Sequence, residues 1–354
     1  MTESSVSATR RPRRGSTRIG SIETSSLRFR RPSGRHRLVF IDVEHGVKAS
    51  RSRLVPVQPV SRPTTWQPEP VTVPLTTVDD AVRVLAGIRF VALTGAGIST
   101  DSGIPDYRGP GSPPRNPMTY QQFVGDEAFR RHYWARNHVG WRHMRRTRPN
   151  AGHRALVRLE ERGLLSGTIT QNVDLLHQEA GSRAVIDLHG RYDRVVCLSC
   201  SQVVSRSRLA ERLDALNPGF AESIGAVGDI EIAPDADAVI SATSHFRPAP
   251  CDSCGGVLKP EIVYFGENVP RARVEAAYAM VDGADALLVA GSSLTVMSGL
   301  RFVKRAARDG KPVVIVNRGV TRGDAHATVK VDGGTSSVLP ALVTRLPDLD
   351  ASGP

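Results

Sequence analysis

Four short segments have the composition of buried strands, and each leads directly into small or polar residues. They are Ile88–Leu93, Gly167–Thr170, Ala286–Ala290 and Pro312–Val316. Strands without alternating polar and apolar residues are typical of parallel sheets that helices cover on both faces. A helical stretch around Gly299–Arg308 separates the last two segments. The chain is therefore expected to have an α/β fold with a parallel sheet.

The turns after these strands should lie together, because the carboxyl ends of parallel strands meet at one edge of the sheet. They read Gly95-Ala96-Gly97, Gln171-Asn172, Gly291-Ser292-Ser293 and Asn317-Arg318-Gly319. Ligands of open α/β sheets bind in the crevice beyond that edge. Paired glycines after a strand also allow the backbone to approach a pyrophosphate closely. On the glycines alone, an ordinary strand-to-helix turn is an equally good interpretation.

Two further segments have helical signals. Thr77 is a good N-cap, since Asp79 and Asp80 follow in the first turn and Gly87 provides a stop. Residues 120–146 also have a helical composition. This second segment carries Tyr133, Trp134 and Trp141, and we expect these aromatic side chains in the core rather than against a ligand.

The four cysteines of the chain form two C-x-x-C pairs, with 50 residues between the pairs. Each pair places two thiolates on one tight turn, and two such turns supply the ligands of a closed tetrahedral zinc site. Two redox-active motifs are the alternative, but neither pair follows a thioredoxin-like strand. We therefore expect one structural zinc ion, bound by Cys197, Cys200, Cys251 and Cys254.

Basic residues concentrate in the first 70 positions. This segment has a net charge of +9, out of +12 for the whole chain, and is rich in Arg, Ser, Thr and Pro. We expect it to be disordered, with one candidate strand at Leu38–Ile41. A nucleic-acid tether, a transit peptide and a start assigned too early are other interpretations. The nearly neutral remainder is not expected to bind nucleic acid, and no apolar run is long enough to suggest a membrane partner.

Five motif blocks follow one another in a distinctive order. They are Gly95–Gly109, Thr170–His177, Leu188–Gly190, Lys259–Glu267 and Gly291–Leu294, and the cysteine pairs lie between the third and fourth. In order and spacing, residues 77–345 resemble the sirtuin family of NAD-dependent protein deacylases. Residues 133–141 and 216–218 further resemble its class II branch, which includes a mitochondrial lipoamidase and ADP-ribosyltransferase.

The resemblance implies a division of the chain. The basic tail, residues 1–70, has no counterpart in the family, and a catalytic domain would cover residues 71–354. Within that domain, a large Rossmann-like part would comprise residues 77–118, 150–192 and 259–345, with a helical insertion at 119–149 and a zinc module at 193–258. NAD and an acyl-lysine protein or peptide would bind in the cleft between the large part and the zinc module.

The resemblance also assigns residues to NAD. The Gln-Asn-x-Asp block would hold the ribose and the nicotinamide amide, a mobile loop would cover the cofactor, and the later turns would hold phosphate and the adenine ribose. The expected cofactor-binding residues are Gly95, Ala96, Gly97, Ser99, Asp106, Tyr107, Arg108, Gln171, Asn172, Val173, Asp174, Gly291, Ser292, Ser293, Asn317, Arg318, Gly319 and Thr335.

For the reaction, the resemblance implies that the acyl oxygen attacks the nicotinamide ribose, that nicotinamide leaves, and that 2′-O-acyl-ADP-ribose and free lysine result. His189 would be the general base, because the ordinary pKa of imidazole lies near neutral pH. Asn172 and Asp174 would be catalytic too, although both residue types are also common helix N-caps. His177 is expected to be structural.

The resemblance places the substrate beside the fourth motif block. The peptide backbone would pair, as an added strand, with an edge of the chain. That edge would consist of Val263, Tyr264, Phe265, Gly266 and Glu267.

An NAD-dependent protein-lysine deacetylase or deacylase is the leading interpretation. Protein ADP-ribosylation or lipoamide cleavage in the same site is the alternative, and a non-catalytic NAD-binding or ADP-ribose-binding module comes third. Only five of the 47 basic residues are lysines, as is typical of a high-GC bacterium. We therefore expect a cytoplasmic location ahead of a mitochondrial one.

Overall fold

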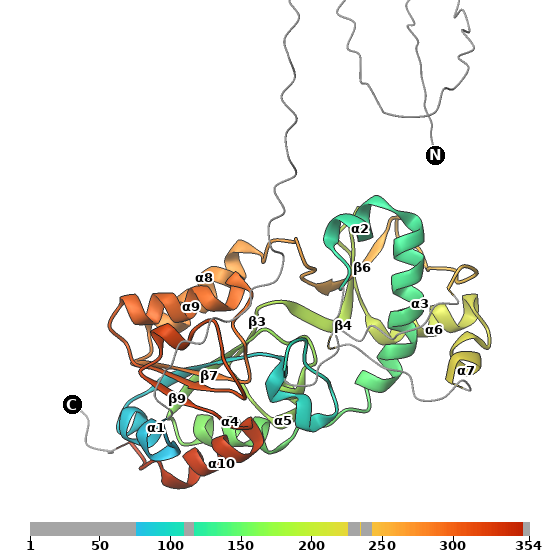
Figure 1. Cartoon of the computed structure of the whole chain (residues 1–354). Coiled ribbons are helices and arrows are strands. Elements are labelled where there is room, and N and C mark those ends of the chain that lie inside the picture. Colours follow the sequence, from blue (N-terminus) through green and yellow to red (C-terminus); the bar gives the residue numbers. More distant parts are fainter. Residues whose placement is uncertain (1–75, 110–116, 226–233, 235–242, 350–354) are drawn as a thin grey trace, which may run out of the picture. The chain divides into compact units, whose positions relative to one another are not determined.

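The computed structural model describes residues 76–109, 117–225, 234 and 243–349 (Figure 1). The expected basic tail and the candidate strand at Leu38–Ile41 lie outside these described residues. No helix in the described part of the chain combines the length and apolar character needed to cross a bilayer.

A six-stranded sheet forms the larger part, and its strands follow the order β3-β2-β1-β7-β8-β9. Every neighbouring pair is parallel. The expected α/β fold with a parallel sheet is therefore confirmed. The sequence analysis missed two strands of three residues each, which close the two edges. The bounds are β1 (Phe90–Thr94), β2 (Leu165–Thr170), β3 (Val185–Asp187), β7 (Ala286–Ala290), β8 (Val313–Val316) and β9 (Val329–Val331).

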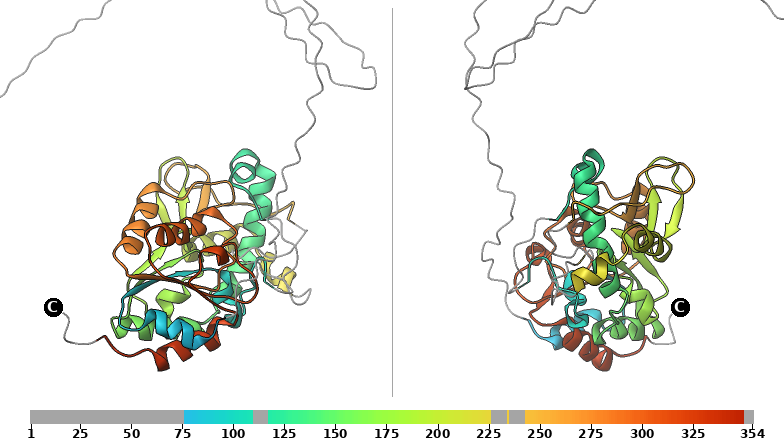
Figure 2. Two further views of the ribbon diagram at one scale, coloured as in Figure 1. Left: turned by 60° about the vertical axis from the view of Figure 1, so that its left-hand side comes forward. Right: turned by 90° about the vertical axis from the view of Figure 1, so that its right-hand side faces the viewer.

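Helices cover both faces of this sheet (Figures 1 and 2). Along β1, Phe90 and Ala92 pack on one side and Val91 and Leu93 on the other. Burial on both faces explains why the strands are continuously apolar. The helices are α1 (Val78–Leu85), α4 (Ala151–Glu161) and α10 (Thr335–Arg345) on the first face, and α8 (Arg271–Asp282) and α9 (Met297–Arg308) on the second. The short helix α5 (Leu176–Ala180) lies beside α4.

Local capping signals set where helices begin. The Thr77 hydroxyl accepts a hydrogen bond from the backbone of Asp80, whose carboxylate in turn accepts one from the backbone of Thr77. This reciprocal pair confirms the N-cap expected for α1. Asn150 and His153 form the same arrangement at the start of α4.

A second, antiparallel sheet has the order β5-β4-β6. It shares one hydrophobic core with the helices α2, α3 and α6. The sheet begins at Gly190 and ends at Ile262, and the expected zinc module at 193–258 stays a prediction. The bounds are α2 (Tyr120–Gly125), α3 (Glu127–Met144), β4 (Gly190–Cys197), β5 (Val203–Ser205), α6 (Arg206–Leu216), α7 (Phe220–Gly225) and β6 (Leu258–Ile262).

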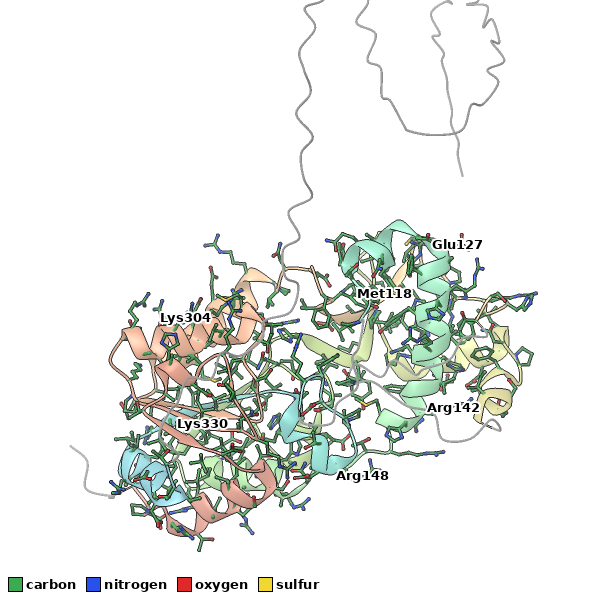
Figure 3. All side chains as sticks on the ribbon, in the orientation of Figure 1. Met118, Glu127, Arg142, Arg148, Lys304 and Lys330 are labelled. Atoms are coloured by element: carbon green, nitrogen blue, oxygen red, sulfur yellow. The ribbon has the colours of Figure 1, made fainter. Side chains whose placement is uncertain are left out.

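The helical stretch expected over residues 120–146 is two helices rather than one. Asp126 separates them, because its carboxylate accepts hydrogen bonds from the backbone of Ala128 at 2.6 Å and Phe129 at 3.3 Å and so caps α3. On α3, Arg142 forms ion pairs of 2.8 Å with Asp214 of α6 and Glu222 of α7 (Figure 3). These ion pairs join α3 to α6 and α7.

The expected placement of Tyr133, Trp134 and Trp141 in the core is confirmed, since all three are buried. Arg206 of α6 lies among them, fully buried, with its guanidinium 5.5 Å from the ring centre of Trp134 and 5.2 Å from that of Trp141. Its Nε donates to the side-chain oxygen of Asn137 at 3.1 Å. A cation therefore links α6 to α3 inside the shared core.

Two glycine turns interlock where β1 and β7 lie side by side. The Gly97 backbone N–H, in the short helix η1 (Ala96–Ile98), donates to the carbonyl of Gly291 at 2.8 Å. A β-carbon on Gly97 would lie 2.9 Å from that carbonyl oxygen, and one on Gly291 would lie 2.3 Å from the backbone nitrogen of Ile98. Gly291 also has a φ of +65°. The two turns leave no room for any side chain between them.

We predict that Gly97→Ala lowers the free energy of unfolding by about 1–3 kcal/mol, because the added methyl overpacks a contact with backbone atoms. Urea unfolding curves of the variant and the wild type measure this difference. Gly125→Ala is the control, since a β-carbon there meets nothing within 4 Å. Equal stability of the Gly97→Ala variant and the wild type would contradict the interlock.

Candidate active site

A cavity of about 690 Å³ opens at the carboxyl ends of β1, β2, β7 and β8. It lies where the strand order reverses between β1 and β7, which is the usual ligand position in such sheets. Expected residues from each of the four turns meet here, and His189 and the residues from Val263 to Glu267 line the same cavity. Gly319 alone of the expected cofactor residues does not line the cavity; its backbone N–H donates to Asp332 at 3.2 Å.

Ser99, Asn172 and Asp174 form a hydrogen-bonded group just beyond the carboxyl ends of β1 and β2. The Ser99 hydroxyl donates to Asp174 Oδ2 at 2.6 Å, and Asn172 Nδ2 lies 3.0 Å from Ser99 Oγ and 3.2 Å from the same carboxylate oxygen. Asp174 Oδ1 also accepts from the backbone of Leu176 at 3.0 Å, at the start of α5. Asp174 thus binds the first residue of α5 with one carboxylate oxygen and also lines the cavity.

Gln171 joins β2 to the turn after β7. Its Nε2 donates to Ser292 Oγ at 2.7 Å and to the carbonyl of Thr94 at 3.2 Å. A β-carbon on Gly299 would lie 2.5 Å from Gln171 Oε1, so this position in α9 has to be glycine for the amide to fit. These contacts hold the turns after β1, β2 and β7 together.

His189 stands between the two sheets, after β3 and directly before β4. Its Nδ1 lies 2.9 Å from the carbonyl oxygen of Gln171, and its Nε2 lies 2.8 Å from the Ser298 hydroxyl. Removal from water lowers the pKa of His189 to about 4, and the nearby Arg273 and Arg301 act in the same direction. The imidazole is therefore neutral at pH 7, as a general base must be.

The loop expected to hold the cofactor is organised by Asp106. Its carboxylate accepts hydrogen bonds from the backbones of Arg108, at 3.2 Å, and Gly109, at 2.6 Å. Arg108 is exposed, and the ring of Tyr107 meets that of Phe265 edge to face at 6.0 Å. The loop therefore presents a cation at one wall of the cavity and touches the expected substrate segment.

The segment from Val263 to Glu267 is a turn rather than a strand. Val263 N donates to the carbonyl of His189 at 2.7 Å, and Glu267 N donates to that of Tyr264 at 3.0 Å. Phe265 pairs with Thr119 as an isolated parallel bridge. The expected pairing of this segment with a substrate backbone stays a prediction.

A buried lysine holds that turn in place. Lys259 Nζ lies 3.1 Å from Glu267 Oε2 and donates to the carbonyl of Ile262 at 2.5 Å. The same glutamate oxygen accepts from the backbone of Tyr264 at 2.9 Å. Burial lowers the pKa of Lys259, whereas Glu267 opposes this shift. The sequence analysis took Lys259 only as part of a motif and assigned it no role.

Sequence reasoning also missed cavity-lining residues on α9. Ser298 and Arg301 line the cavity, three and six residues after Thr295, which lies beyond the motif block that ends at Leu294. Leu294 itself has a φ of +54°, a left-handed conformation that is strained for a residue with a side chain. Such strain is often found at functional sites. Ser298 and Arg301 are three residues apart, a spacing that places two side chains on the same face of a helix. This spacing is the one signal in the sequence that could have pointed to both.

His177 has the packing of a structural residue. His177 is buried on α5, does not line the cavity, and its Nε2 lies 2.9 Å from Thr94 Oγ1. His153 of α4 lies beside it, with ring centres 5.0 Å apart. Burial lowers the pKa of His177 to about 3 and that of His153 to about 4, so both rings are neutral packing partners behind Ser99.

The four cysteine thiols converge at the far end of the antiparallel sheet. All four sulfur atoms lie within 4.8 Å of one another, with Cys197 to Cys254 at 3.5 Å and Cys200 to Cys251 at 3.7 Å. Zinc–sulfur bonds of about 2.3 Å require tetrahedral S···S edges of about 3.8 Å, so the thiols fit one zinc ion. The four sulfurs fill every position, which leaves zinc a structural role.

Comparisons with known proteins agree with this geometry. The Sir2 family model matches residues 95–298. "NAD-dependent protein deacetylase 1" of Mycobacterium avium (strain 104) is 64% identical over 270 residues, which cover 76% of this chain and 96% of that protein. The protein of the same description from Streptomyces coelicolor is 52% identical over 294 residues, covering 80% and 96%. A solved structure described as "Sir2-p53 peptide-NAD+" superposes with a TM-score of 0.61 at 31% identity, covering 76% of this chain and 98% of that one.

We predict one zinc ion per chain and its loss in Cys200→Ser, because three thiolates hold the ion far more weakly than four. Cys197 and Cys251 share a core with Trp134 and Trp141, so loss of zinc should also change the near-UV circular dichroism of tryptophan. Metal analysis and dichroism measure both effects. Leu198→Ala, on an exposed side chain between the first two cysteines, is the control. A folded, metal-free Cys200→Ser protein with unchanged dichroism would contradict the structural role.

Proposed function

This chain belongs to the Sir2 family, and from that premise we propose that its cavity removes acyl groups from lysine side chains of proteins, with His189 as the general base. The protein is an NAD-dependent protein deacetylase, and its four cysteines are positioned to bind one structural zinc ion. The observation that carries the proposed role of His189 is the hydrogen bond from its Nδ1 to the carbonyl of Gln171, which leaves Nε2 as the basic nitrogen.

The donor set of the cavity fits a dinucleotide. Hydroxyl groups come from Ser292 and Ser293, an amide and a carboxylate from Asn172 and Asp174, and a guanidinium from Arg318, which lies 3.8 Å from Asp101. NAD, when bound, supplies the ribose that accepts the acyl group as nicotinamide departs. We propose that Asn172 and Asp174 hold ribose hydroxyls and the nicotinamide amide, and that Arg108 and Arg318 balance the phosphate charge.

His189 is suited to take a proton from a hydroxyl at Nε2. A carbonyl oxygen only accepts hydrogen bonds, so the Gln171 carbonyl requires the proton of the neutral ring to be on Nδ1. Nε2 is then the acceptor nitrogen, and its neighbour Ser298 lines the cavity. Because Gln171 also binds Ser292, the same residue orients the base and braces the turn after β7.

We propose that the turn from Val263 to Glu267 binds the substrate peptide. The ion pair of Lys259 and Glu267 holds this turn in place. The backbone N–H of Val263 donates to the backbone carbonyl of His189, so a peptide bound on the turn would lie beside the base. The relatives and solved structures support protein or peptide substrates. The acyl-lysine side chain would enter between this turn and the loop at Tyr107.

Finer assignments are also proposals. The likeness of residues 133–141 and 216–218 to class II sirtuins stays a prediction, as do protein ADP-ribosylation and lipoamide cleavage. We propose the bacterial cytoplasm as the compartment, because the relatives come from bacteria. Nucleic acid is not a proposed partner of the described domain.

We predict that His189→Ala lowers the rate of peptide deacetylation by about 10²–10⁴-fold, since that is what a positioned general base contributes. Formation of deacetylated peptide and of nicotinamide, from NAD and a panel of acyl-lysine peptides, measures the loss. His143→Ala, at an exposed position on α3, is the matched control and should keep full activity.

Two results would contradict the proposal. Nicotinamide release by the wild type that does not depend on an acyl peptide would favour ADP-ribosylation or simple NAD hydrolysis. Deacetylation by His189→Ala at the wild-type rate would remove His189 from the mechanism.

A further inference from the structure

Ser298 is the one side chain within hydrogen-bonding distance of His189 Nε2 among the described residues. It is the second residue of α9, and its hydroxyl lies 2.8 Å from that nitrogen. Both side chains line the cavity, although 109 residues separate them in the chain. The nitrogen assigned to proton transfer is therefore already in contact with a hydroxyl group.

The direction of this hydrogen bond follows from the rest of the site. Nδ1 carries the ring proton, because its partner is the carbonyl of Gln171. In the neutral ring Nε2 has only a lone pair, so the Ser298 hydroxyl must donate to it. The donated hydrogen bond stabilises the neutral ring relative to the charged ring, which has a proton in that position.

We propose that Ser298 is a positioning residue for the deacetylation reaction, which keeps His189 neutral and fixes its ring between two hydrogen bonds until a substrate hydroxyl replaces Ser298 as the donor to Nε2. The proposal rests on the proposed role of His189 as the base. Nε2 has one lone pair and accepts one hydrogen bond at a time, so the incoming hydroxyl replaces Ser298 as the donor. The buried nitrogen therefore keeps a hydrogen-bond partner throughout.

Charged groups around His189 would influence its titration as well. Arg273 of α8 and Arg301 of α9 disfavour the charged ring. Arg273 is paired with Glu261 of β6 at 3.3 Å. Asp187 and Arg191, two residues to either side of His189, form an ion pair of 3.7 Å with each other. None of these groups contacts Nε2, so replacing Ser298 leaves their arrangement intact.

The test combines Ser298→Ala with Ser298→Thr, which keeps a hydroxyl group. Nitrogen-15 NMR of the histidine rings in the intact protein without NAD reports the tautomer and the titration midpoint of His189, and His189→Gln identifies its signals. We expect Ser298→Ala to raise the midpoint by about 0.4–1.1 pH units, the loss of one hydrogen bond to the neutral form. Ser298→Thr should restore the wild-type midpoint.

Deacetylation kinetics give the second readout. The acid limb of the kcat/KM profile for NAD should move up by the same amount in Ser298→Ala, so that the rate ratio of wild type to variant grows as the pH falls from 7 towards 5. Ser207→Ala is the matched control, since Ser207 is the exposed second residue of α6.

An unchanged midpoint and acid limb in Ser298→Ala would overturn the proposal, and so would a Ser298→Thr variant as impaired as Ser298→Ala. Failure of the proposed role of His189 as the general base would give a different result. If His189 were not the base, His189→Ala would stay active while the NMR midpoint still responded to Ser298→Ala.

Discussion

Backbone contact between two turns is the constraint on which the site depends. The chain runs from β1 outward to β3, enters the antiparallel sheet, and returns to the parallel sheet at β7, directly beside β1. Gly97 and Gly291 let the turns after these two strands touch through backbone atoms alone. Gln171 and Ser292 then join the turn after β2 to the same cluster. Residues almost 200 positions apart in the chain thereby form one rigid wall.

Burial gives the polar groups on that wall their chemical character. The Ser99 and Asn172 side chains donate hydrogen bonds to the Asp174 carboxylate, and these offset the loss of water at its buried position. Burial has a different result at His189, because loss of water lowers the pKa of the imidazole and so favours its neutral form. A carboxylate fixed by hydrogen-bond donors and an imidazole that is neutral at pH 7 therefore lie at one cavity.

The sequence predicts the parts of the fold that depend on local composition. The cores of β1, β2, β7 and β8 follow from their apolar runs, and the zinc ligands follow from cysteine spacing. It does not predict β3 and β9, which have three residues each and form only through pairing with a neighbour. Gly95 and Gly97 were correctly placed at the cavity, but they serve contact between turns as well as access for a ligand. Ser298 could not be foreseen, because its contact with His189 depends on how α9 is seated.

His189 and Leu188 are the only residues between the last strand of one sheet, β3, and the first strand of the other, β4. The carbonyl of His189 binds Val263 beyond β6, its ring binds Gln171 beyond β2, and Ser298 of α9 holds the remaining nitrogen. His189 thus lies at the junction between the two sheets, with hydrogen bonds to residues on both sides of it. A shift of one sheet against the other would stretch at least one of these hydrogen bonds, so the position of the His189 ring depends on how the two sheets pack together.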